Sequence, residues 1–178
     1  MALVEHIEST IGPIDVMVFN IGANSPNSIL TETARRYTKM WEMACLAGFL
    51  VGREVAKRMV LRPDAQGTAG PSHKGTIIFT GATASLRGSS HFAGFSGGKM
   101  ALRALAQSMA RELHPQGIHV AHVVIDGGIR SARRAEPADN PDSLLDPDAI
   151  ALSYLNLIRQ PRNAWSSELE LRPFVERF

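Results

Sequence analysis

The sequence predicts an α/β fold in which helices cover both faces of a partial, doubly wound parallel sheet. Short apolar runs at 14–20, 76–80 and 118–125 alternate with longer segments whose apolar residues recur every three or four positions. The short runs are typical of buried strands, and the longer pattern is typical of amphipathic helices. Strands and helices that alternate at this spacing form right-handed crossovers, so the strands are expected to lie parallel in one sheet.

The first half of the chain is expected to form a short helix, a strand and a long helix. The helix at 1–11 stops at a Gly-Pro pair. Apolar residues occupy both alternating sets of positions in the strand at 14–20, which predicts that both faces of this strand are buried. Thr31 or Thr33 can cap a helix that extends to about Leu61.

The second half continues the alternation after a loop rich in Gly, Pro and Ser. The predicted elements are a strand at 76–80, a helix at 96–114, a strand at 118–125, a helix at 147–159 and a short strand at 168–174. Four strands are few for a doubly wound sheet, but 178 residues fit a single domain.

Composition and charge argue against several classes of protein. The net charge is +2, and the basic residues are scattered except at Arg130, Arg133 and Arg134, so we expect no nucleic-acid partner. The longest apolar run, 43–52, is too short to cross a membrane. Cys45 is the single cysteine, which precludes an internal disulfide and suits a reducing cytoplasm.

Motifs for phosphate, metal and nucleophile chemistry are incomplete. A phosphate loop that ends at Lys99 would need glycine at Ala93, and no Gly-x-Gly-x-x-Gly follows a strand. Ser96 lies in a Gly-x-Ser-x-Gly pattern, but no strand directly precedes it. His119 and His122 are three apart on a strand and face opposite sides, so no metal site is expected.

Four segments, in order, resemble motifs of the short-chain dehydrogenase/reductase family. Asn-Ile-Gly at 20–22 follows an apolar strand, as the family's Asn-Ala-Gly does. Phe-Ser-Gly-Gly-Lys at 95–99 is similar to the Tyr-x-x-x-Lys of the family's active-site helix, which 101–113 continue. Residues 118–129 resemble the strand that ends in the family's Pro-Gly turn.

The resemblance implies strands four to seven of a seven-stranded Rossmann-like sheet. The expected organisation is one Rossmann-like domain over 1–178 that lacks the N-terminal cofactor-binding half. The family's Gly-rich loop and ribose-binding acid have no counterpart in this sequence. We therefore expect no cofactor, and NAD(P) only if the chain is an oxidoreductase after all.

The resemblance also implies an altered active site. The family uses a Tyr to transfer the proton, a Ser to orient the carbonyl and an Asn to complete a water relay. These positions hold Phe95, Ala82 and Cys45, and only the family's lysine remains, as Lys99. Loss of a general acid costs roughly 10²–10⁴-fold in rate, so ordinary dehydrogenase activity is not expected.

Loops at the carboxyl ends of the strands are expected to meet in one crevice. Lys99, Asp126 and His91 are the catalytic candidates, with Lys99 and Asp126 facing each other across an apolar pocket. The alternative is an inherited lysine, a structural aspartate and a solvent-exposed histidine. The candidates for substrate or cofactor binding are Asn20, Gly22, Asn24, Ser85, Gly127 and Ile129.

Three functions follow as hypotheses. The first is a non-redox enzyme of the isomerase, cyclase or lyase type that acts on a small molecule in the old substrate pocket. The second is an NAD(P)-dependent oxidoreductase of alcohols or carbonyl compounds. The third is a non-catalytic dimeric scaffold, because the helices at 33–61 and 96–114 correspond to those that pair subunits in the family.

Overall fold

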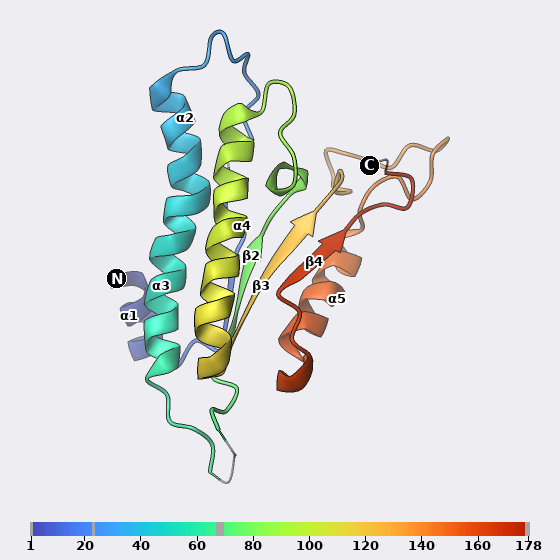
Figure 1. Cartoon of the computed structure of the whole chain (residues 1–178). Coiled ribbons are helices and arrows are strands. Elements are labelled where there is room, and N and C mark those ends of the chain that lie inside the picture. Colours follow the sequence, from blue (N-terminus) through green and yellow to red (C-terminus); the bar gives the residue numbers. More distant parts are fainter. Residues whose placement is uncertain (1, 23, 67–69, 177–178) are drawn as a thin grey trace.

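A parallel four-stranded sheet forms the centre of the molecule in the computed structural model (Figure 1), which describes residues 2–22, 24–66 and 70–176. The strands are β1 (Val16–Phe19), β2 (Gly75–Thr80), β3 (Ile118–Ile125) and β4 (Glu168–Leu171), and each lies beside the next in that order. Every pair of neighbours is parallel. The predicted fold class is confirmed.

The helices agree closely with the predicted ranges. They are α1 (Ala2–Thr10), α2 (Ala34–Trp41), α3 (Ala47–Val60), α4 (Ala93–Leu113) and α5 (Pro147–Ile158). A π-helical segment, Glu42–Leu46, joins α2 to α3 into the long helix expected over 33–61. Thr33 caps it, because its side chain accepts a hydrogen bond from the Arg36 N–H. Residue 1 of the expected first helix lies outside the described residues.

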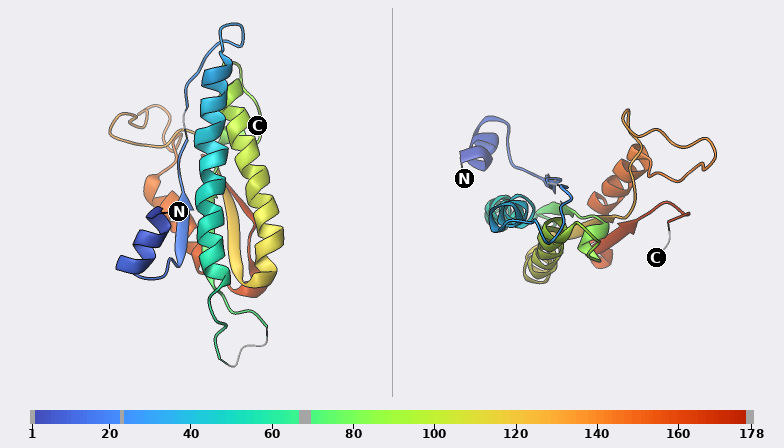
Figure 2. Two further views of the ribbon diagram at one scale, coloured as in Figure 1. Left: turned by 90° about the vertical axis from the view of Figure 1, so that its left-hand side faces the viewer. Right: turned by 90° about the horizontal axis from the view of Figure 1, so that it is seen from above.

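The helices pack in layers on the two faces of the sheet (Figure 2). One face of the sheet packs against α3 and α4 through buried side chains that include Phe19, Phe79 and Val120. The other face packs against α5 through Ile78, Ala121, Val123 and their neighbours. Alternate residues of each strand therefore face different helices, as the period of a strand requires.

The prediction that both faces of the first strand are buried is wrong. Met17 and Phe19 of β1 are buried, but Val16 is 38% exposed and Val18 is 47% exposed. The apolar cluster beneath α5 contains residues of β2, β3 and β4 and none of β1. Since β1 is an edge strand that α5 does not reach, its outer face stays open.

Within the described part of the chain, no helix is both long enough and apolar enough to cross a membrane.

Candidate functional site

Lys99 is the most firmly held of the predicted site residues. It lies near the start of α4, and its Nζ donates hydrogen bonds to the carbonyl oxygens of Thr80, at 2.8 Å, and Ile21, at 3.4 Å. The residue is 5% exposed. Burial lowers the pKa of its ammonium to about 8. A lysine with this pKa is partly neutral near pH 8 and can then accept a proton.

Glycines give space to the Lys99 side chain and to the first turns of α4. A Cβ on Gly22 would lie 3.1 Å from Cε of Lys99, so a larger residue there would crowd the lysine. A Cβ on Gly94 would lie 2.5 Å from Cε of Met40, and one on Gly98 would lie 3.1 Å from the Met40 carbonyl oxygen. The glycines of α4 therefore let it approach α2 closely.

The three positions at which the sequence predicts altered catalytic groups hold side chains of little acidity. Nζ of Lys99 lies 6.0 Å from the centre of the Phe95 ring, which has no proton to transfer. Ala82 follows β2, and its backbone N–H donates to Oγ of Ser85, a buried side chain. Cys45 lies buried in the π-helical segment, and burial raises the pKa of its thiol.

Asp126 pairs with Arg172 and not directly with Lys99. The Asp126 carboxylate is buried, accepts a hydrogen bond from Oγ1 of Thr83 and lies 3.1 Å from Nη2 of Arg172. Among the described residues, Lys99 forms no ion pair with Asp126. Arg172, just after β4, supplies the positive partner of Asp126 instead.

The remaining candidates lie in loops at the carboxyl ends of the strands. His91 is exposed in the loop before α4, with a φ of 70°, and its carbonyl accepts a hydrogen bond from the Asn27 N–H. Asn20 and Asn24 are exposed in the loop after β1. Gly127 has a φ of 153°, and a Cβ there would lie 2.7 Å from Cδ of Pro173.

Sequence reasoning missed Tyr154, which lies close to the Lys99 site. Its hydroxyl is 2.8 Å from Oγ1 of Thr80, the residue whose carbonyl binds Lys99. Burial raises the pKa of the Tyr154 phenol, so it stays protonated at neutral pH. The sequence carried one signal that Tyr154 faces the sheet, because Tyr154 lies four residues from both Ile150 and Ile158 on the predicted helix.

His122 is a buried histidine of β3 that contacts Glu168 of β4, and Glu168 in turn binds Arg103 of α4. Nδ1 of His122 lies 3.2 Å from Oε2 of Glu168, which also accepts from Arg103 of α4 at 2.7 Å. Burial lowers the pKa of His122 to about 4, although the Glu168 carboxylate opposes this shift. His122 is therefore neutral at physiological pH and ties the strand to the helix.

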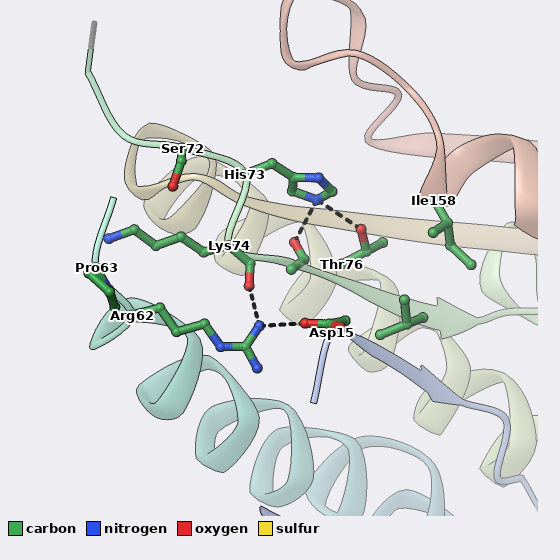
Figure 3. A pocket seen from close by; sticks show the side chains of 10 residues that line it. Asp15, Arg62, Pro63, Ser72, His73, Lys74, Thr76 and Ile158 are labelled. Carbon is green, nitrogen blue, oxygen red and sulfur yellow. Dashed lines mark hydrogen bonds and ion pairs between the residues drawn. The ribbon is translucent and has the colours of Figure 1, made fainter. Parts of the chain in front are cut away.

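A different hollow lies at the opposite, amino ends of β1 and β2 (Figure 3). It has a volume of about 390 Å³. Arg62 donates there to the Asp15 carboxylate at 3.0 Å and to the carbonyl oxygen of Lys74 at 2.7 Å. His73 contacts Oγ1 of Thr76 at 3.2 Å. These groups bind one another, so we assign them to anchoring the loop before β2.

No group of three or more potential metal-ligating side chains occurs in the described ranges.

The fold and the motif order agree with the comparison to known families. Residues 1–141 match the family described as short chain dehydrogenase. The chain belongs to the short-chain dehydrogenase family. Membership explains why Lys99 sits at the carboxyl ends of the strands, where open α/β sheets carry their ligand sites.

Relatives of known structure share the fold over nearly the whole chain. A short-chain dehydrogenase from Rhodopseudomonas palustris is 44% identical, with a TM-score of 0.76, and the match covers 97% of this chain and 68% of that one. An alcohol dehydrogenase from Thermococcus sibiricus, complexed with 5-hydroxy-NADP, is 18% identical with a TM-score of 0.77 over 99% of this chain and 70% of that one. The second likeness concerns the fold alone.

A curated relative is similar over a shorter stretch. The 3-oxoacyl-(acyl-carrier-protein) reductase MabA of Mycobacterium avium is 27% identical over 124 residues, which are 70% of this chain and 44% of the reductase. The chain thus spans less than half the length of that relative.

The described residues do not form a cradle for the pyrophosphate of NAD(P), the cofactor that the family implies. Such a cradle needs a glycine-rich turn that leads directly from a strand into a helix N-terminus. The helices after β1, β2 and β3 begin at Ala34, Ala93 and Pro147, each more than ten residues beyond the strand. The described residues thus lack the strand-to-helix turn at which the pyrophosphate of NAD(P) binds in such folds.

Proposed function

We propose that this member of the family has lost NAD(P)-dependent hydride transfer and acts as a non-redox enzyme on a small carbonyl compound. The observation that carries the proposal is the state of Lys99, which is buried, has a pKa of about 8 and lies beside Phe95 rather than a phenol. A lysine of this kind serves proton transfer, whereas carbonyl reduction needs a proton donor at the position of Phe95. The reaction class is isomerisation, cyclisation or elimination.

Lys99 acts in this proposal as a general base. Its neutral amine accepts a proton from the carbon next to the substrate carbonyl, and the ammonium that forms is stabilised by the carbonyl oxygens of Thr80 and Ile21. The proton then returns to another carbon or oxygen of the substrate. Asp126 and His91 are the further catalytic candidates of this proposal. Substrate binding is assigned to Asn20, Gly22, Asn24, Ser85, Gly127 and Ile129.

Proton exchange on a simple ketone tests this proposal. We expect the chain to catalyse exchange of the α-protons of cyclohexanone in D₂O at pH 8, followed by proton NMR, without oxidation of added NADPH. Lys99→Met should reduce the exchange rate at least about 10²-fold, in the range for loss of a general base. Lys57→Met, which removes an exposed lysine of α3, is the matched control and should leave the rate unchanged. Equal exchange by the parent and Lys99→Met would contradict the assignment.

The second candidate function is an NAD(P)-dependent oxidoreductase of alcohols or carbonyl compounds. Identity of 44% to a protein described as a short-chain dehydrogenase favours it, and this chain covers only 68% of that protein. A further polypeptide segment beside β1 would have to supply the pyrophosphate site. This candidate requires NADPH oxidation that depends on Lys99, which the exchange experiment measures in parallel.

We propose a homodimer formed through α3 and α4, in the cytoplasm, with no nucleic-acid or membrane partner. A groove of about 730 Å³ runs between the two helices and is lined mainly by apolar side chains, among them Phe49, Val60, Leu105 and Met109. Two-fold pairing would cover this groove with the same groove of a second copy. The surface also supports the third hypothesis, a dimeric scaffold without catalysis.

Phe49→Glu is expected to convert the dimer to a monomer, because it places a charge in the apolar groove. Light scattering at micromolar concentration should give twice the 19.3 kDa of one chain for the parent and 19.3 kDa for the variant. Phe174→Glu changes an exposed phenylalanine outside the groove and should remain dimeric. A parent mass that stays at 19.3 kDa on concentration would refute the dimer.

A further inference from the structure

A further hollow lies between the outer face of β1 and helix α5, and it shares Asn20 and Ile129 with the residues assigned to substrate binding beside Lys99. Its volume is about 460 Å³, within the range of small-molecule sites. Three of its apolar side chains remain partly open to solvent, with Val18 47%, Ile129 41% and Leu155 44% exposed. Apolar side chains gathered around one hollow favour an apolar ligand, since each gains from being covered.

Two hydroxyl groups meet at this hollow. Thr80 and Tyr154 both line it, and their oxygens are 2.8 Å apart. Within the described chain, this is the sole hydrogen bond of either hydroxyl. One bond uses a single donor hydrogen, so the pair retains a second O–H hydrogen and free lone pairs. The pair can therefore either donate to or accept from one oxygen of a ligand.

The residues around the hollow also define the charge of a ligand. None of the side chains that line it is charged, and Asn20 adds an uncharged amide at the end of β1. An ion would lose its hydration there without gaining a partner, whereas a neutral molecule loses little. The hollow therefore fits a neutral, mainly apolar molecule.

We propose that this hollow is a binding site for a small neutral ring compound with one hydroxyl or carbonyl oxygen, held by the Thr80–Tyr154 hydroxyl pair. The apolar body of the ligand packs on Val18, Ile129 and Leu155, and its oxygen bonds to the pair. Because Asn20 and Ile129 are shared, the site deepens the function proposed for Lys99, but ligand binding here requires no proton transfer by that lysine. The two meet at Thr80, whose side chain faces the hollow and whose carbonyl binds Lys99.

Two probes of matched shape test the proposal on the full chain. 2-Naphthol carries the hydroxyl and 2-methylnaphthalene lacks it, and calorimetric or fluorescence titration gives their affinities. We expect 2-naphthol to bind more tightly, and Tyr154→Phe to weaken it about fivefold, as expected for one hydrogen bond, without weakening 2-methylnaphthalene. Tyr37→Phe, at the chain's other tyrosine, is the matched control and should leave both affinities unchanged.

A second variant keeps the test valid if Tyr154→Phe folds poorly. Ala151 is exposed on α5 and lines the hollow, so Ala151→Phe should fill it and abolish binding of both probes while α5 still forms. Circular dichroism checks the fold of each variant. The proposal is overturned if neither probe binds the parent, or if Ala151→Phe binds 2-naphthol as the parent does.

Discussion

The free energy of unfolding should fall by about 2 kcal/mol between pH 7 and pH 5 because of His122 alone. Burial lowers the pKa of His122 from 6.5 to about 4, and the side chain is fully buried on β3. In the unfolded chain this histidine binds a proton as the pH drops through 6.5, while in the folded chain it stays neutral to about pH 4. The stability that the neutral His122 ring contributes is therefore fully present above pH 6.5, and it is lost as the pH falls from 6.5 to 4.

Urea unfolding at pH 5, 6 and 7 measures this loss. His122→Gln removes the titrating group, so its stability should depend on pH less steeply than that of the parent by about the 2 kcal/mol above. The groups that face His122 are Glu168, Arg103 and Lys99, and none of them is changed in this comparison. His91→Gln, at an exposed histidine, should retain the pH dependence of the parent. Identical slopes for the parent and His122→Gln would show that the buried ring does not resist protonation.

Lys99→Met should stabilise the fold at pH 7 although it removes the proposed general base. The lowered pKa, about 8 against an ordinary 10.5, means that keeping the charged ammonium buried costs about 3 kcal/mol at pH 7. Methionine avoids this cost but leaves the carbonyl oxygens of Thr80 and Ile21 without their donor, a loss of about 1 kcal/mol for each. The expected net gain is about 1 kcal/mol.

The stabilisation expected for Lys99→Met depends on pH. The cost of the buried ammonium is fully present below pH 8 and disappears as the pH rises towards 10.5, where the unfolded chain also loses its proton. Lys99→Met should therefore be more stable than the parent at pH 7 and less stable at pH 10 in urea unfolding. Lys57→Met, at an exposed site, controls for loss of charge. A variant that is less stable than the parent at both pH values would show that Lys99 is a structural residue.

The order of elements could be predicted because local patterns carry it. Apolar runs and helical periodicity gave every strand and helix, and the helix that begins at Ala93 rather than 96 differs only at a glycine-rich end. The exposure of the outer face of β1 could not be predicted, because it depends on how far α5 reaches across the sheet. Val16 and Val18 have the same apolar character whether covered or open.

The site was predictable where a motif fixes a residue and not where distant segments meet. The resemblance of 95–99 to the family's Tyr-x-x-x-Lys motif singled out Lys99. Pairing of Asp126 with Arg172 joins two segments that follow different strands, and Tyr154 meets Thr80 across 74 positions of sequence. Such contacts depend on the packed sheet, so neither the Asp126–Arg172 pair nor the Tyr154–Thr80 contact could be predicted from the sequence.

Calorimetric titration of the purified chain with NADH and NADPH tests the loss of hydride transfer most directly. Since no strand leads directly into the N-terminus of an α-helix in the described residues, we predict no binding at micromolar cofactor. A dissociation constant in the micromolar range or tighter for either nucleotide would contradict the account, and it would favour the oxidoreductase.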